Sequence, residues 1–530
     1  MAVIETPPET ATAASELAIS VLRAQPTGLA GVLGSGDHKV LGRMFIITSL
    51  LFGLVVVALG QAFAVEGLTP KTLSVFSAET VFQFFTFFRL ASVFLLAIPL
   101  VIGVAFVVVP LQVGASSLAF PRAAAASFWG WLLGSALLVA SYAMNGGPGG
   151  GSAKGVNLWI AALALVVVAI LLAAVSLATT VLALRTPGLT LDRAPLFAWS
   201  VLVASIMWLL TMPVLFGLLA LMYVDHRHAG NTFGANGGLY GRLLWVLRNP
   251  QIYTVAIPVL GFAADALATT ARTRIAPRFV AQGAIAAFGI LGFGAFLAGA
   301  TSEAGAYDSL VVIAVGVAAV LPVLAISGVV GDLFRRGSFR LTAGALYAVS
   351  SLLILLLGVT AGALGSIPRL DTAGTVFDLG VTNAVVLASI IASLGGVHWW
   401  ATKIGRQPAN EAIGRLAPLV LLFGAAAVVI PDLISGLAGD GAETRLDWTG
   451  GIKGLNVVVV IGTAVVLLGL LAAIVSLLPI VKGGTDVVAD PWEGQTLEWL
   501  APSPPPLSNF EGPLPEVTSA EPLLDLREEK

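Results

Sequence analysis

The 530-residue sequence has no cysteine and little charge. Without cysteine the chain can form no disulfide, no iron–sulfur cluster and no thiolate-ligated metal site. Charged residues make up 11% of the sequence and hydrophobic residues 57%, whereas a soluble domain has about 25% charged residues. So few charges cannot cover a chain of this length with polar surface, so we expect a lipid bilayer around it. The net charge of −2 gives no reason to expect nucleic-acid binding.

Histidine is scarce as well, with four residues: His38, His226, His228 and His398. Any metal site would have to use these, carboxylates or the six methionines. His226 and His228 flank Arg227 in a predicted outer loop, and with Asp225 they have the spacing of a weak metal site. The alternative interpretation, which we favour, is a solvated loop.

Long apolar runs dominate the middle of the chain. A membrane helix needs about 20 apolar residues. Twelve stretches qualify: 44–64, 84–109, 126–145, 157–184, 195–222, 251–270, 279–301, 308–332, 342–364, 378–400, 417–436 and 454–481. Runs this continuous are unlike the one-sided pattern of soluble helices. They predict an all-α fold, a polytopic membrane bundle of twelve transmembrane helices.

The two ends of the chain differ from this membrane domain, which we assign to residues 38–482. Residues 1–37 are polar, without apolar periodicity and without a signal peptide, and predict a disordered tail. Residues 483–530 are proline-rich and predict an extended tail outside the membrane.

Basic residues predict the orientation of the bundle. Sixteen lysines and arginines fall on the side that carries both termini, and eight fall on the other side. The positive-inside rule therefore predicts cytoplasmic termini. We expect the location to be a bacterial plasma (inner) membrane.

Five segments carry more specific motifs. They are 37–44 (DHKVLGRM), 110–129 (PLQVGASSLAFPRAAAASFW), 185–200 (RTPGLTLDRAPLFAWS), 245–263 (WVLRNPQIYTVAIPVLGFA) and 491–512 (PWEGQTLEWLAPSPPPLSNFEG). In this order they resemble landmarks of subunit I of cytochrome c oxidase, in the haem-copper oxidase superfamily. The resemblance spans nearly the whole chain. It implies the twelve-helix subunit I fold, haem and copper as family cofactors, and other respiratory subunits as partners.

The resemblance also identifies the positions of the family's histidine ligands, and none carries histidine here. The haem positions are Phe87 or Phe88, Gly380 and Thr382, and the copper positions are Asn249, Ala298 and Gly299. Because four histidines are too few for the family's set of six, we expect a degenerate member that binds no haem and no copper.

The family's proton-path positions have also lost their ionisable groups. They are occupied by Ser117, Gln251 and Ile326, whereas the family tyrosine is retained as Tyr253. The arginine pair that holds the haem propionates in the family falls on Ala442 and Glu443. We therefore expect no redox-driven proton pumping by this chain alone.

Arg89 is an ionisable residue inside the second predicted span, where an unpaired charge is costly. We expect it to pair with Asp378 across the position where the family has a haem, with helix-2 phenylalanines filling the remaining space. The alternative is that Arg89 extends to the outer surface.

These interpretations favour a non-catalytic subunit I homologue that acts as a scaffold or regulatory subunit of a respiratory, electron-transport membrane complex. A channel or transporter that reuses the oxidase core is the first alternative. An active terminal oxidase, with the family's cytochrome-c oxidase activity, is the second. Enzymatic activity therefore stays open, although the replaced ligands argue against it.

Overall fold

The computed structural model describes residues 28–69, 75–78, 80–148, 150–228, 230, 232–233, 239–295, 306–372, 375–439, 452–481 and 488–529. Within these ranges the secondary structure is helical, without strands, as the sequence predicts. The predicted copper positions Ala298 and Gly299, and also Ala442 and Glu443, lie outside the described residues.

The first half of the bundle follows the predicted spans closely. It consists of α3 (His38–Glu66), α4 (Val81–Ala91), η1 (Ser92–Ala97), α5 (Ile98–Gln112), α6 (Pro121–Ala143), α7 (Ala153–Ala183), α8 (Leu196–Arg227) and α9 (Leu239–Ala271). Together, α4, η1 and α5 form one continuous span in which η1 is a π-helical segment.

The second half continues in the same way. It consists of α10 (Arg278–Ala295), α11 (Ala306–Ala318), α12 (Val320–Arg336), α13 (Ala343–Gly365), α14 (Val376–Trp399), α15 (Ala401–Ile404), α16 (Glu411–Leu437) and α17 (Lys453–Leu477). Eleven helices in the described ranges are long and apolar enough to cross a membrane, and α10 adds a shorter apolar helix within the predicted stretch 279–301. The predicted twelve-helix bundle is therefore consistent with the structure.

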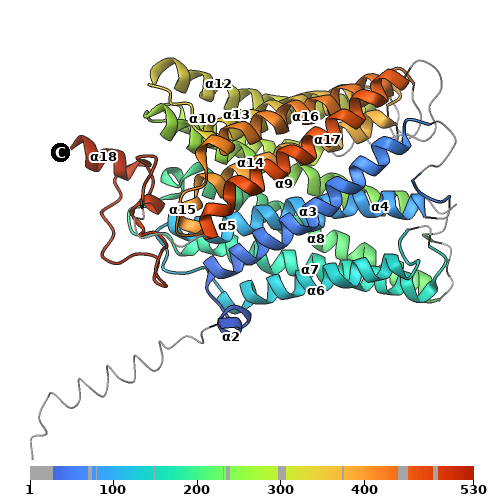
Figure 1. Ribbon diagram of the computed structural model, residues 1–530, viewed down its shortest axis with the longest axis horizontal. Helices are drawn as coiled ribbons and strands as arrows, with labels where there is room; N and C mark the ends of the chain where they lie inside the picture. Colours follow the sequence, from blue (N-terminus) through green and yellow to red (C-terminus); the bar gives the residue numbers. More distant parts are fainter. Residues whose placement is uncertain are drawn as a thin grey trace, which may run out of the picture.

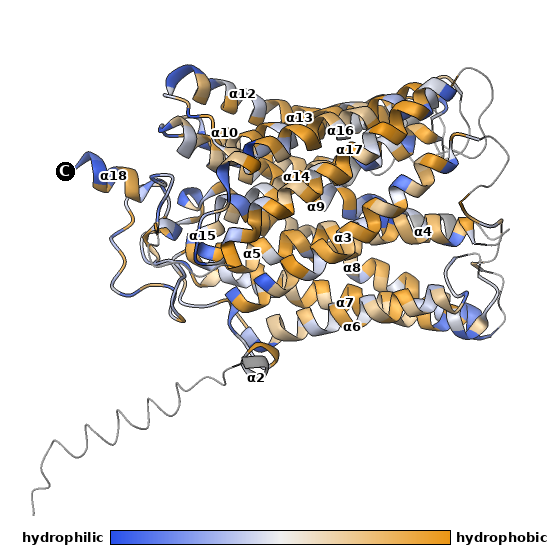
Figure 2. Cartoon of the chain, viewed as in Figure 1, coloured by the Kyte–Doolittle hydropathy of each residue, from blue (hydrophilic) through white to orange (hydrophobic). Residues whose placement is uncertain are grey.

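The helices run side by side along one direction, and apolar residues cover most of their length (Figures 1 and 2). The short helix α2 (Gly28–Leu33) and the last helix α18 (Pro522–Glu528) lie at the same end of the bundle (Figure 1). We call this end the tail end.

Three spans form the centre of the bundle. In the most apolar window of Val81–Gln112 and of Trp245–Ala271, 94% of the residues are buried, and in Val376–Trp399 the share is 78%. The outer helices have a smaller share of buried residues, because lipid takes the place of protein on their exposed faces. The centre of the fold is therefore built by α5, α9 and α14.

Small residues let the helices approach closely where they cross. A Cβ at Gly42 of α3 would lie 2.6 Å from the carbonyl oxygen of Gly103 in α5, so neither position has room for a side chain. Close crossings at small residues are typical of membrane helices, whose association depends on packing. Next to this crossing, Phe45 makes edge-on contacts with Phe106 and Phe128.

The C-terminal tail lies against the tail end of the bundle. It contains the short helices η6 (Leu497–Leu500) and α18 and is bound by ion pairs to the chain between α9 and α10: Arg272 with Glu493, and Arg274 with Asp525 and Glu528. In the tail, Trp492 stacks on Trp399 with ring centroids 4.9 Å apart.

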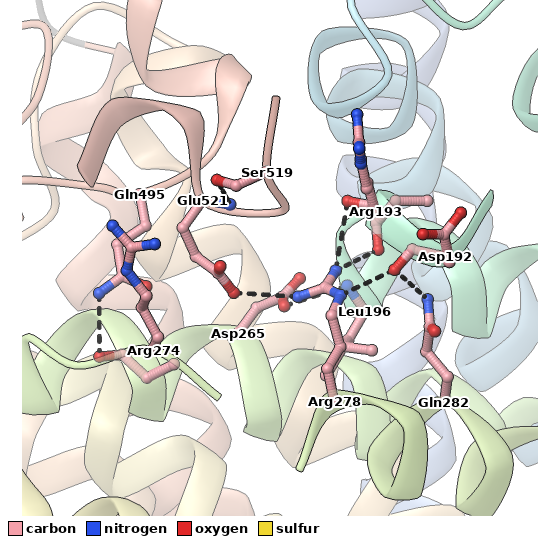
Figure 3. A network of polar contacts seen from close by, with 12 residues as sticks. Asp192, Arg193, Leu196, Asp265, Arg274, Arg278, Gln282, Gln495, Ser519 and Glu521 are labelled. Carbon is pink, nitrogen blue, oxygen red and sulfur yellow. Dashed lines mark hydrogen bonds and ion pairs between the residues drawn. The ribbon is translucent and has the colours of Figure 1, made fainter. Parts of the chain in front are cut away.

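Arg278, the first residue of α10, connects the tail to the loop before α8 (Figure 3). Its guanidinium donates to Glu521 at 3.1 Å and to the carbonyl oxygen of Asp192 at 3.0 Å. Beside it, Asp265 of α9 accepts hydrogen bonds from the first two amides of α8, those of Leu196 and Phe197. This carboxylate therefore caps α8 from a neighbouring helix.

Two buried ionisable groups hold the tail from inside. The Lys403 ammonium donates to the carbonyl oxygens of Ala489 and Ala501, and burial lowers the pKa of Lys403 to about 8. Glu498 of η6 accepts hydrogen bonds from Gln112 and Trp400, and burial raises the pKa of this carboxyl above its usual value.

Candidate functional site

The predicted haem positions of the second span carry aromatic side chains that pack into the protein. Phe87 is 9% exposed and meets the Tyr142 ring edge-on, with centroids 5.1 Å apart. Phe88 packs against Phe63 on α3 at 6.0 Å. Both rings thus pack within the protein, whereas Phe82 and Phe84 are exposed.

Arg89 follows directly and does reach inward. Its Nη2 atom donates to the Thr382 hydroxyl of α14 at 3.4 Å, and its guanidinium lies 5.7 Å from the centre of the Phe85 ring. The second and tenth predicted spans are therefore joined at the expected level, with Thr382 as a neutral acceptor.

The acidic residue of the expected ion pair has a further basic neighbour. Asp378 forms a salt bridge with Arg248 of α9, with 2.6 Å between Nη2 and Oδ2. This charged link ties α14 to α9, whereas Arg89 of α4 reaches α14 one turn further on, at Thr382. The Arg89–Asp378 pairing itself stays a prediction.

The remaining haem position, Gly380, lies at a tight helix crossing. A Cβ at Gly380 would lie 3.0 Å from the Cβ of Asp432 and 3.2 Å from Leu433. A side chain as large as imidazole would therefore require α16 to move away from α14.

The start of the sixth predicted span carries three polar residues close to one another in sequence. Asn249 accepts a hydrogen bond from the Arg248 Nε atom at 2.8 Å. Gln251 is fully buried, and its amide nitrogen donates to the Thr211 hydroxyl at 3.4 Å, while its Oε1 atom accepts no hydrogen bond within the described part of the chain. Tyr253 packs on the Phe288 ring at 6.2 Å, and its hydroxyl lies against Gly362.

The other two proton-path positions lie in different surroundings. Ile326 of α12 is fully buried in the apolar core, and Ser117 is exposed in the loop between α5 and α6. Neither side chain can ionise, which agrees with the replacement read from the sequence.

The four histidines lie in separate parts of the molecule. His38 is buried and lies 2.7 Å from the Phe106 carbonyl oxygen and 3.0 Å from Asn509, so it ties α3 to the tail. His398 is buried near Asn410 and Glu411. At the end of α8, His226 is half-buried and His228 is exposed, and no three histidine, aspartate or glutamate side chains gather as a metal site in the described ranges.

Asp225, the proposed third ligand of that loop, instead accepts hydrogen bonds from the backbone amides of Thr232 and Phe233. The carboxylate therefore organises the loop, in agreement with the simpler interpretation.

The sequence reasoning missed Arg248 and Thr211. Arg248 lies in a quoted motif, but we counted it only as an outer basic residue. Its place one residue before Asn249, at the start of a central span, was the available signal. Thr211 had no signal, since it is one of many small polar residues in α8.

Comparisons with known proteins explain this architecture. The family model described as "Cytochrome C and Quinol oxidase polypeptide I" matches residues 40–481. The chain belongs to this oxidase polypeptide I family. It is 30% identical to the putative cytochrome c oxidase subunit 1-beta of Streptomyces coelicolor, over 92% of this chain and 89% of that protein. It is 27% identical to cytochrome c oxidase subunit 1 of Bacillus subtilis, over 96% and 84% of the two chains.

A solved structure shares the fold. It is a heme-copper terminal oxidase dimer studied by cryo-EM, with a TM-score of 0.67 at 12% identity, over 92% of this chain and 89% of that chain. The resemblance read from the loop motifs and the predicted membrane bundle are thus confirmed. The chain is a cytochrome c oxidase subunit I-like membrane protein.

Membership in this family contradicts the expectation of a chain without cofactors. The family, its named relatives and the fold are those of heme-copper oxidases, and nothing in the comparisons points to the loss of heme or copper. The absence of histidine at the expected heme and copper positions does not establish the absence of these cofactors.

The side chains at the described positions still do not fit the ligand set that the family resemblance implies. Phe87, Phe88 and Gly380 offer no donor atom, and Gly380 has no room for a larger residue. Thr382 and Asn249 offer oxygens that already accept hydrogen bonds from arginines. These positions therefore assign no ligand to heme or copper, and the assignment of each position stays a prediction.

Proposed function

We propose that this subunit I-like protein serves a bacterial respiratory complex in the plasma membrane as a scaffold or regulatory subunit. Both of its termini face the cytoplasm. In this role the chain contributes its fold and its outer surfaces to the assembly, and oxygen reduction is performed by other subunits.

The observation that carries the proposal is a set of side-chain contacts among the three central spans, Val81–Gln112, Trp245–Ala271 and Val376–Trp399. The contacts lie at or beside the expected heme and copper positions. Arg248 bridges to Asp378, and Arg89 donates to Thr382. Side chains thus connect α14 to both α4 and α9. A rigid centre of this kind supports a structural role.

Purification from membranes in mild detergent tests the proposal. We expect other respiratory membrane subunits to co-purify in constant proportion with the tagged chain. We also expect oxygen uptake by the isolated chain, supplied with reduced cytochrome c or a quinol, to stay at the level of a protein-free blank. Catalytic oxygen uptake by the isolated chain would show instead that it is an active terminal oxidase.

The transporter alternative gains no support from the cavity between α5, α9 and α14. This cavity has a volume of about 10 Å³ and is lined mainly by apolar side chains such as Val104 and Phe262. Such a space holds about one water molecule, so it offers no path for a solute.

A further inference from the structure

A polar cavity of about 390 Å³ opens at the tail end of the bundle, apart from the inner spans described above. Its walls come from the end of α9, the segment before α13, the end of α14, the start of α16 and the C-terminal tail. Cavities of about 300–1,000 Å³ are the usual size of small-molecule sites. The cavity is therefore large enough for a ligand, and the C-terminal tail forms one of its walls.

The charges around this cavity are unbalanced. Its lining includes three arginines, Arg272, Arg340 and Arg415, against the single carboxylate of Glu411. Glu411 accepts a hydrogen bond from the Arg415 Nε atom at 3.1 Å, and Arg272 pairs with Glu493 of the tail. Arg340 is exposed, and its guanidinium makes no hydrogen bond or ion pair within the described residues.

An excess of like charge around one cavity is unfavourable unless an anion neutralises it. The guanidinium group is the side chain best suited to this task, because its planar fork of N–H donors matches two oxygens of a phosphate. Three guanidinium groups around one cavity therefore match a phosphate, which has several negative oxygens, better than they match a carboxylate.

The remaining wall is aromatic and rigid. The Trp492 ring of the tail lies parallel to the Trp399 ring, with an interplanar angle of 7°, and its indole nitrogen donates to the Trp399 carbonyl oxygen at 3.0 Å. This pair holds the tail against the bundle beside the arginines. The cavity is thus preorganised and exists only when the tail is docked.

We propose that this cavity is a binding site for a phosphate-bearing anion, in which Arg340 is the principal unpartnered donor and Arg272 and Arg415 flank the ligand. The site is independent of the role proposed above for the whole chain. The phosphate can belong to a lipid headgroup or to a soluble compound. Leu341, which lines the cavity, is 57% exposed, so an acyl chain would find an apolar contact beside the charged groups.

Binding measurements on the full-length protein in mild detergent test the site, with two arms that distinguish the sources. In the first arm, isothermal titration calorimetry measures the binding of inorganic pyrophosphate and of ATP. In the second, native mass spectrometry counts bound phosphatidylglycerol, with phosphatidylcholine for comparison. Binding in the first arm identifies a soluble ligand, binding in the second identifies a lipid headgroup, and either result supports the proposal.

Substitution of Arg340 decides whether the binding occurs in this cavity. We expect Arg340→Gln to weaken binding by about tenfold, since a charge-assisted bond is lost. Arg340→Lys, which keeps the charge without the fork, should lose less. Arg335→Gln is the matched control: it removes a charge at the same end of the bundle, its side chain is 78% exposed, and it does not line the cavity. Because the Arg340 guanidinium makes no hydrogen bond or ion pair within the described residues, the variants should keep the melting temperature.

Two results would overturn the proposal. One is the absence of binding in both arms at about 1 mM probe. The other is an equal loss of affinity in Arg340→Gln and Arg335→Gln, which would show attraction by the overall charge and no defined site.

Discussion

The salt bridge between Arg248 and Asp378 leads to the sharpest prediction about the stability of the bundle. Its atoms are 2.6 Å apart and its side chains are 23% and 31% exposed, so it is neither a surface pair nor a fully buried one. At this distance, two charges in an effective dielectric of 20 attract by about 6 kcal/mol, most of which offsets their desolvation.

Measured pairs bracket the expected net value. Exposed ion pairs contribute about 0.2–1 kcal/mol, whereas removing one partner of a buried pair costs about 3–5 kcal/mol. We therefore expect a coupling free energy of about 2 kcal/mol for this half-buried pair. The losses of unfolding free energy caused by the two single substitutions should therefore add up to more than the loss caused by the double substitution.

The assay is a double-mutant cycle on Arg248→Met and Asp378→Leu, with unfolding followed in mixed detergent micelles. Methionine keeps the apolar stem of arginine, so the change reports mainly on charge. The exposed pair of Arg335 with Asp332 is the matched control, for which we expect less than about 1 kcal/mol. A parallel cycle on Arg89→Met and Asp378→Leu tests the pairing inferred from sequence.

The reasoning fails if the Arg248–Asp378 coupling is no larger than that of the exposed control. It also fails if the Arg89–Asp378 coupling exceeds it, because the sequence-based pairing would then describe the protein better than the structure does.

Three further predictions concern the tail end and the orientation. Because burial raises the pKa of the Glu498 carboxyl in the folded chain, the folded state holds this proton more tightly, so the stability of tail docking should fall as pH rises from the ordinary glutamate pKa toward the raised value. Glu498→Gln should weaken this pH dependence while keeping the tail protected, as judged by limited proteolysis across pH, and the remainder belongs to Glu521, whose carboxyl pKa burial also raises. An unchanged pH profile would contradict the assignment. Arg278→Gln should expose the tail to protease, because the Arg278 guanidinium binds both Glu521 and backbone carbonyl groups. The control is Arg406→Gln, a change at another basic residue of the predicted cytoplasmic side. Equal protease sensitivity of the two variants would contradict the role of Arg278. Reporter fusions in the loop Asn145–Ser152 should lie on the outer side of the membrane, and a cytoplasmic reporter there would reverse the proposed orientation.

The sequence by itself determined the class of the fold. Twelve continuous apolar runs require helices, because backbone groups in lipid must be hydrogen-bonded within their own segment. The loop motifs then identified the family, and the comparisons confirm it. The inference to cofactor loss went further than the sequence allows, since a count of histidines at aligned positions does not establish what the family fold binds.

Only the tertiary structure decided which helices meet and which charges pair. Lipid and protein interior are both apolar, so hydropathy cannot distinguish the central span Val81–Gln112 from the outer span Leu310–Arg336, whose mean hydropathies are 2.9 and 2.8. The partner of Asp378 depends on the rotation and depth of neighbouring helices, which no local pattern encodes, and the structure supplies Arg248. The proline-rich tail carries no long apolar run, yet its isolated tryptophans and charges meet complementary groups that come together only when the bundle has assembled. Contacts between distant segments fix these features, so they become visible only in the folded chain.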